Sequence, residues 1–221
     1  MRTLRLAAVL TAGALALSAC GNSANKDGKD TSASSAQVKI VATTTQICDY
    51  VTQIATDTSP NATLTLNKTD PAGKKTTVGA AEDKAKSTIN LTCLLAPNAS
   101  AHEHEMTPAQ SKALANADLM LVSGVDLEHF LDDAVKSTGF KGTMGVTSGI
   151  LSSKDVDDIT KAKEAETSLP YKVDRGITKV NIAKWPFPPE QGESEPEFRF
   201  DPHVWTSPRN ASFQVRNIGS F

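Results

Sequence analysis

Residues 107–146 read TPAQSKALANADLMLVSGVDLEHFLDDAVKSTGFKGTMGV, and this stretch decides the predicted fold. It opens with a helix start, because Thr107 and Gln110 are spaced as a capping box and Pro108 stands at the first helical position. The predicted helix is followed by an apolar strand over 119–122. A helix followed by a buried strand is the repeating unit of an α/β fold.

The second half of this stretch repeats the pattern. Leu127, Leu131 and Ala134 recur at helical spacing and mark the buried stripe of a second helix. Gly139 is the expected residue after its last turn, where a left-handed backbone favours glycine. A further strand is expected over 143–146.

Upstream residues extend the same alternation. An apolar strand is expected over 38–42 and another over 89–95, with a helix between them that starts near Thr44. Strands that alternate with helices predict an α/β fold, in which helices flank a parallel sheet.

Three segments are less regular. We interpret residues 57–88 as a long surface insertion with a short strand over 63–66, and residues 152–200 as a partly ordered excursion. Ser207 is a candidate N-cap for a final helix that continues to the last residue, Phe221.

The first residues resemble a bacterial lipoprotein leader. Two arginines precede a twelve-residue apolar run, which is too short to span a bilayer as a mature helix, and Leu-Ser-Ala-Cys follows at 17–20. This lipobox pattern predicts a signal peptide over 1–19 and lipidation of Cys20, whose two acyl chains would hold the protein on the membrane. Residues 20–37 are almost free of apolar side chains and are predicted to be a flexible tether.

Composition limits the possible partners. The chain has 221 residues, of which 39% are hydrophobic, and a formal net charge of −2. This is the composition of a globular protein, and collagen-like or wholly disordered chains are excluded. Removal of the signal peptide leaves 21 basic and 25 acidic residues, so no basic excess points to nucleic acid as a partner.

Two cysteines follow the predicted lipidation site. Outside the cytosol Cys48 and Cys93 can be oxidised to a disulfide, or they can remain as two buried thiols. The sequence supports both alternatives.

Three histidines are candidate metal ligands. His102 and His104 lie in the connection that leaves a predicted strand, and His203 lies in a turn before the final helix. Ligands of α/β sheets bind outside the carboxyl ends of the strands, and an extended segment would direct His102 and His104 to one side. Neutral imidazole suits zinc and other borderline transition ions.

Five stretches resemble the substrate-binding lipoproteins of bacterial zinc and manganese ABC importers, the metal-binding cluster A-I family. They are the lipobox, the first strand with Ala42-Thr43-Thr44, PNASAHEHEMTP at 97–108, residues 117–128, and DPHVW at 201–205. The resemblance implies one lobe of a protein with two α/β lobes joined by a long helix, with one metal ion held between them.

The resemblance also implies the roles of individual residues. His102 matches the family's first metal-binding histidine and His203 its second. His104 stands where the family usually has an aromatic residue, so it is an auxiliary ligand, a capture site at the cleft mouth, or a plain substitution. From its place in the chain, Glu105 is expected to support the loop or the following helix start, where an ionised side chain suits the helix dipole. His129 lies on a predicted helix, off its apolar stripe, and by that position is expected to be a solvated helix residue rather than a ligand.

The family's third and fourth ligands come from its C-terminal lobe. Residues 38–221 match the N-terminal lobe only, and we therefore expect the C-terminal lobe to be absent from this chain. The visible donors are imidazoles, which favours zinc, with manganese as the alternative because it prefers more oxygen donors.

The predicted function is extracytoplasmic capture of a divalent transition metal ion by a monomer, and its delivery to an ABC importer permease. No enzymatic activity is expected. Two alternatives stay open: an exported zinc-dependent hydrolase, suggested by His102-Glu103-His104, and a surface adhesin lipoprotein without a transport role. The motifs of zincins, serine hydrolases and phosphate loops are not found in the sequence.

Overall fold

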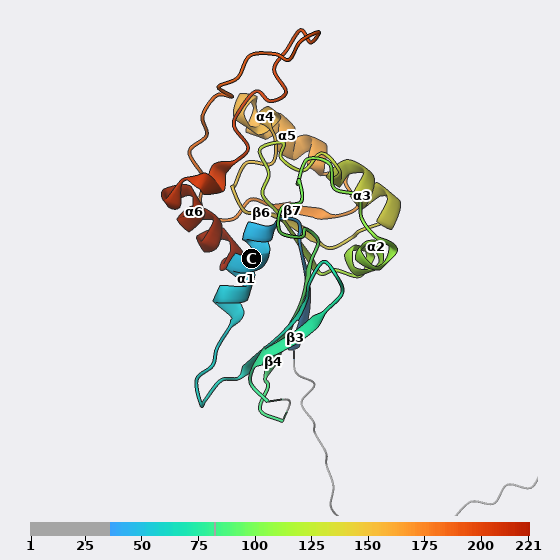
Figure 1. The fold of residues 1–221 in the computed structure, drawn as a ribbon, viewed down its shortest axis with the longest axis vertical. Coiled ribbons are helices and arrows are strands. Elements are labelled where there is room, and N and C mark those ends of the chain that lie inside the picture. Colours follow the sequence, from blue (N-terminus) through green and yellow to red (C-terminus); the bar gives the residue numbers. More distant parts are fainter. Residues whose placement is uncertain (1–35, 82) are drawn as a thin grey trace, which may run out of the picture. The chain divides into compact units, whose positions relative to one another are not determined.

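A seven-stranded sheet runs through the computed structural model, which describes residues 36–81 and 83–221 (Figure 1). The order across the sheet is β3-β2-β4-β1-β5-β6-β7, and every neighbouring pair is parallel except the hairpin of β2 and β3. This confirms the predicted α/β fold. The strands are β1 Ala36–Ala42, β2 Leu64–Thr69, β3 Lys75–Gly79, β4 Ser87–Cys93, β5 Leu119–Val122, β6 Thr143–Val146 and β7 Lys172–Asp174.

Helices cover both faces of the sheet (Figure 1). One apolar cluster lies under α2 and α3, and a second lies under α1 and the end of α6. Side chains of β1 alternate between the two clusters: Val41 belongs to the first, and Ile40 and Ala42 belong to the second. The helices are α1 Thr45–Ala55, α2 Pro108–Ala115, α3 Leu131–Thr138, α4 Ser153–Asp157, α5 Ile159–Glu166 and α6 Pro208–Ile218, with the 3₁₀ helix η1 Val204–Thr206.

The helix boundaries follow local chemistry. Thr107 and Gln110 form the predicted capping box at α2, and the Ser207 hydroxyl accepts a hydrogen bond from the Asn210 backbone N–H at the start of α6. Gly139 ends α3 with a left-handed backbone, φ 66°. The structure confirms these three predictions. They could be made from the sequence because each cap depends only on residues that are neighbours in the chain.

Two expectations about the N-terminal half need correction. The first strand begins at Ala36, so the last two residues of the predicted tether pair with β4. The segment over 57–88 is not mainly a surface insertion, because it supplies β2 and β3, and Leu66 is buried in the core. The β-branched threonines of β2 suit a strand, and most of its partner strand β4 lies beyond residue 88.

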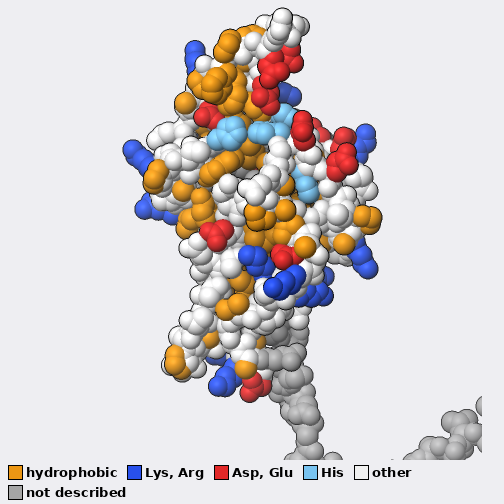
Figure 2. Space-filling view, in the orientation of Figure 1, with side chains coloured by type: hydrophobic (Ala, Val, Ile, Leu, Met, Phe, Trp, Pro, Cys, Tyr) orange, Lys and Arg blue, Asp and Glu red, His pale blue; other side chains and the backbone are white. Residues whose placement is uncertain are grey.

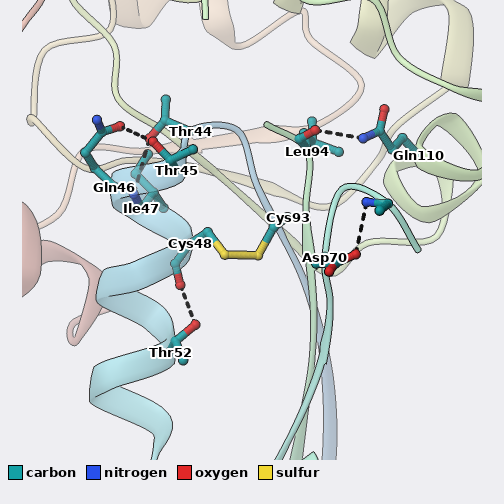
Figure 3. The surroundings of a disulfide bond; sticks show 11 residues. Thr44, Thr45, Gln46, Ile47, Cys48, Thr52, Asp70, Cys93, Leu94 and Gln110 are labelled. Atoms are coloured by element: carbon teal, nitrogen blue, oxygen red, sulfur yellow. Dashed lines mark hydrogen bonds between the residues drawn. A yellow bond between two sulfur atoms is a disulfide. The ribbon is translucent and has the colours of Figure 1, made fainter. Parts of the chain in front are cut away.

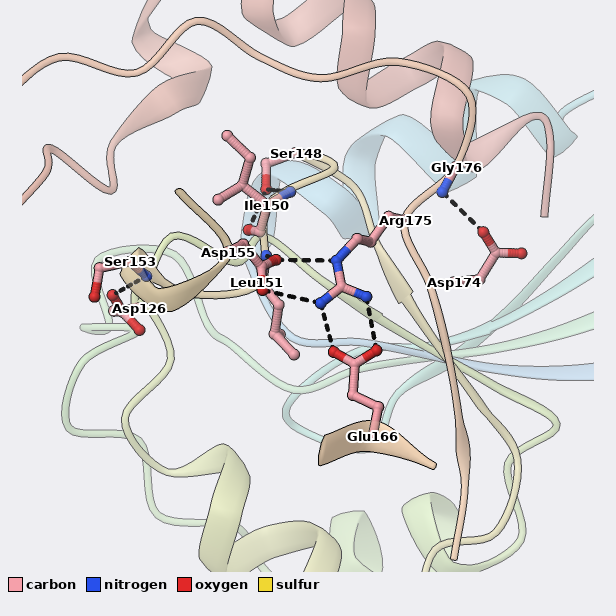
Figure 4. A network of polar contacts seen from close by, with 10 residues as sticks. All are labelled: Asp126, Ser148, Ile150, Leu151, Ser153, Asp155, Glu166, Asp174, Arg175 and Gly176. Carbon is pink, nitrogen blue, oxygen red and sulfur yellow. Dashed lines mark hydrogen bonds and ion pairs between the residues drawn. The ribbon is translucent and has the colours of Figure 1, made fainter. Parts of the chain in front are cut away.

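The segment over 152–200 is more regular at its start than expected. It forms α4, α5 and the edge strand β7, and Arg175 joins them by ion pairs to Asp155 and Glu166 (Figure 4). Helix α5 has no buried residue, which explains why its hydrophobic pattern gave no signal.

The final helix is shorter than expected. It ends at Ile218, and Phe221 lies beyond it and packs against the second apolar cluster.

A disulfide joins α1 to β4 (Figure 3). The Cα atoms of Cys48 and Cys93 lie 5.6 Å apart, a separation usual for disulfides, and both residues are buried. Of the two alternatives left by the sequence, the structure therefore has the bonded one.

The predicted signal peptide, the lipidation site Cys20 and the tether up to residue 35 lie outside the described residues. Among the residues that the structure does describe, none of the helices has the length and apolar character needed to cross a membrane.

Candidate metal centre

Three histidine rings converge near the carboxyl ends of the parallel strands. His102 lies in the connection after β4, His129 in the turn after β5, and His203 immediately before η1. The ring centroid of His102 is 5.5 Å from that of His203 and 5.7 Å from that of His129. Figure 2 shows histidine side chains gathered on one face beside hydrophobic and acidic side chains.

The His102 ring is oriented by the backbone of the neighbouring turn. Its Nδ1 lies 3.0 Å from the carbonyl oxygen of Leu127. A carbonyl oxygen only accepts hydrogen bonds, so Nδ1 is the donor and carries the proton. This contact selects the tautomer with the proton on Nδ1 and leaves the Nε2 lone pair free for a ligand.

The His203 ring is oriented in the same sense by a carboxylate. Its Nδ1 lies 2.8 Å from Oδ1 of Asp201, and the His203 backbone N–H donates to that same oxygen. A carboxylate that holds the outer nitrogen of a histidine is the usual support of a metal-binding imidazole, because it fixes the ring and raises its basicity.

The spacing of His102 and His203 is compatible with a shared ion. At a zinc–nitrogen distance of about 2.0–2.1 Å and a tetrahedral angle, two bound imidazole rings have centroids about 5 Å apart. The observed 5.5 Å is close to this value. The structure thus brings together the two predicted ligands, although no group of three or more His, Cys, Asp or Glu in the described ranges is already arranged around one ion position.

Aromatic side chains line this cluster. Phe198 is 4% exposed, and its ring centroid lies 5.1 Å from that of His102 and 5.0 Å from that of Trp185. Trp205 stands edge-on to His203 at 5.3 Å. Burial lowers the pKa of His102, and the charge of a protonated His203 lowers it further. Both effects keep the His102 imidazole neutral, the form that binds metal.

His104 does not join the cluster. Its ring packs edge-on against Phe130 at 5.2 Å, and its Nε2 is buried without a hydrogen-bond partner in the described part of the chain. The backbone bends at 101–103, so His102 and His104 do not project to one side as an extended segment would have them. Burial also lowers the pKa of His104. Glu105 is exposed, two residues before the N-cap of α2.

A buried carboxylate fixes the turn between β5 and α3. Glu128 accepts hydrogen bonds from the Thr43 hydroxyl at 2.7 Å and from the backbone N–H groups of Ser123 and Gly124 at 2.7 and 3.1 Å. Burial raises the pKa of Glu128, and these hydrogen bonds act in the opposite direction. The same turn contains Val125 at φ 58°, a left-handed conformation that is rare for a β-branched residue and costs roughly 1–3 kcal/mol.

The location of His129 differs from the expectation. It is exposed as predicted, but it lies in this turn, because α3 begins only at Leu131. The site also contains three residues that the sequence motifs do not predict as part of it: Asp201, Trp185 and Phe198. The Asp201-Pro202-His203 motif was a usable signal for the first of these. The other two stand in a stretch without periodicity and reach the cluster only through the tertiary fold.

The fold and the site define an α/β protein with paired, oriented imidazoles at the carboxyl ends of a parallel sheet. The family described as zinc-uptake complex component A, periplasmic (ZnuA) matches residues 40–220. The chain therefore belongs to this family of zinc-importer substrate-binding proteins, as the sequence motifs predict. No curated protein matches the chain.

Two solved structures from Streptococcus pneumoniae are similar to this chain. Zn(II)-bound AdcA is 14% identical, with a TM-score of 0.41, over 84% of this chain and 25% of that one. The Zn(II)-bound ZnuA-like domain of AdcA is 16% identical, with a TM-score of 0.40, over 83% of this chain and 42% of that one. The chain thus spans less than half the length of either structure.

Proposed function

We propose that this chain captures a divalent transition metal ion outside the cytoplasm and passes it to an ABC importer permease. The proposal depends on one observation above all. His102 and His203 lie with their rings 5.5 Å apart, and each has its Nδ1 held by an oxygen, so each has Nε2 available. Membership of the zinc-uptake family supports the same function.

Zinc is the favoured ion and manganese the alternative. Two neutral imidazoles are borderline donors that suit zinc, whereas manganese prefers carboxylate, carbonyl and water oxygens. Two imidazoles supply half of a tetrahedral set, and the other positions are open to water or to further donors.

The remaining parts of the proposal concern location and assembly. The lipobox pattern at 17–20 supports a lipid anchor on Cys20, and the family's periplasmic description supports an extracytoplasmic location. We propose that the protein works as a monomer and changes no covalent bond of its cargo. We propose that residues 38–221 form the N-terminal lobe of a two-lobed carrier.

Zinc titration of histidine variants tests the proposed site. Loss of the group that hydrogen-bonds the non-ligating nitrogen of a metal-binding histidine usually lowers metal affinity about 10–100-fold. Loss of a ligand itself should therefore lower zinc affinity more than about 100-fold. We expect this loss for His102→Ala and for His203→Ala in isothermal titration calorimetry. His104→Ala is the matched control and should bind zinc as the unmodified chain does, since its ring packs on Phe130.

The assignment of His102 and His203 as ligands would be wrong if His102→Ala and His203→Ala both bound zinc with unchanged affinity. Circular dichroism of each variant separates loss of a ligand from loss of the fold. A dissociation constant lower for manganese than for zinc would reverse the preference between the two ions.

The pH dependence of zinc binding gives a second test. Protons compete with zinc for a neutral imidazole, and the pKa of free His102 lies below its ordinary value of about 6.5. The titration midpoint of metal-free His102 should therefore lie below 6.5, and zinc affinity should fall as the pH is lowered toward that midpoint. NMR titration of the His102 ring in the metal-free chain measures this pKa directly.

Phe198→Ala is the informative variant for this titration. It exposes the His102 ring and should move its midpoint upward. A midpoint above 6.5 in the unmodified chain would contradict the burial argument.

A further inference from the structure

The turn after β5 places a third imidazole beside the pair described above. The ring centroid of His129 lies 5.7 Å from that of His102, nearly the same distance as the 5.5 Å between His102 and His203. His102 is thus the middle member of a group of three. Both distances are near the value of about 5 Å expected for two imidazoles on one tetrahedral ion.

The backbone beneath His129 is fixed in this position. Leu127, two residues earlier, accepts the hydrogen bond from Nδ1 of His102, so the turn is tied to that ring. Glu128 ties the other side of the turn to Thr43 and to the backbone of Ser123 and Gly124. The distance between the backbones of residues 102 and 129 is therefore set by the fold.

The His129 side chain, in contrast, is free to turn. It is exposed, and in the described part of the chain its ring makes no hydrogen bond. The centroid of its ring lies 5.5 Å from that of Phe198, which also packs on His102. Rotation about the side-chain bonds of an exposed histidine takes picoseconds to nanoseconds, so an arriving ion can reorient the ring.

We propose that His129 is a third nitrogen ligand for the captured ion, which would complete a three-imidazole set with His102 and His203 on this one chain. The proposal rests on the proposed function and adds a ligand to it. A borderline divalent ion such as zinc accepts three imidazoles and keeps a fourth position for water or another donor. The described side chains do not form this set before the ion binds, so reorientation of His129 is part of the proposal.

The test compares His129→Ala with His104→Ala in the full chain. Each variant removes one imidazole, and the two positions differ in that only His129 lies beside His102. We expect His129→Ala to weaken zinc binding by about tenfold or more, a smaller loss than at His102 or His203 because part of the binding free energy is used to orient the His129 ring. His104→Ala should leave zinc binding unchanged. Visible absorption of the Co²⁺-loaded chain gives an independent readout, because loss of one nitrogen donor shifts the ligand-field bands.

Residue-specific NMR separates a ligand from a bystander. In long-range ¹H–¹⁵N spectra, addition of Zn²⁺ should move one ring nitrogen of His129 together with Nε2 of His102 and His203. Unchanged zinc affinity, Co²⁺ spectrum and His129 ring signals in these experiments would overturn the proposal. The proposed function would survive that result if His102→Ala and His203→Ala still abolished binding, and it would fail only if those variants bound normally.

Discussion

Replacement of both Cys48 and Cys93 by alanine should lower the free energy of unfolding by about 4 kcal/mol or more. The bond closes a loop with a sequence separation of 45 residues, and the chain-entropy relation gives about this value for such a loop. Both residues are buried, so loss of packing adds to the effect. Chemical denaturation of the variant and of the oxidised chain measures the difference.

Reduction of the unmodified chain is the control for this prediction. It breaks the bond and keeps both sulfur atoms, so it separates the cross-link from the packing. A change below about 1 kcal/mol on reduction would show that the bond constrains the unfolded chain far less than the loop length requires.

Arg175→Met should be similarly destabilising, by about 3–5 kcal/mol, because it leaves charges buried without a partner. The side chains of Asp155 and Glu166 are 3% and 16% exposed, and the Arg175 guanidinium donates to both (Figure 4). This network holds α4 and α5 against the segment that follows β7. Thermal or denaturant unfolding monitored by circular dichroism measures the loss.

The chain offers a matched control in a second arginine. Arg199 pairs with Asp157 at 2.6 Å, but both side chains are about half exposed, at 55% and 54%. Exposed pairs contribute about 0–1 kcal/mol, so Arg199→Met should have a small effect. Equal losses in the two variants would contradict the role of burial, whereas partial recovery in the triple variant with Asp155→Asn and Glu166→Gln would support it.

Much of the fold could be predicted because its signals are local. The strands over 119–122 and 143–146 and the start of α2 have the expected bounds, since apolar runs and capping residues act within a few positions. Strand β2 was only partly recognised. Apolar and polar residues alternate only weakly along β2. Its place in the sheet depends on pairing with β4, which follows in the sequence only after β3.

The candidate site could likewise be predicted only where its residues lie in local motifs. His102 and His203 could be identified because each lies in a recognisable motif. The residues that surround these two histidines could not be identified from the sequence. His129 lies next to His102 in the turn after β5, where residues 124–126 take left-handed conformations, and Phe198 lies in the long segment between β7 and η1. Neither placement has a local sequence pattern.

The central position of β1 has a consequence for the order in which the chain folds. This first described strand pairs with β4 on one side and with β5 on the other. During synthesis the edge of β1 that pairs with β5 therefore stays unpaired until the residues up to Val122 have left the ribosome. Folds with such distant pairings have a high contact order, form slowly, and expose aggregation-prone segments while they do so. The nascent chain should accordingly depend on holding chaperones more than a protein built from sequential hairpins.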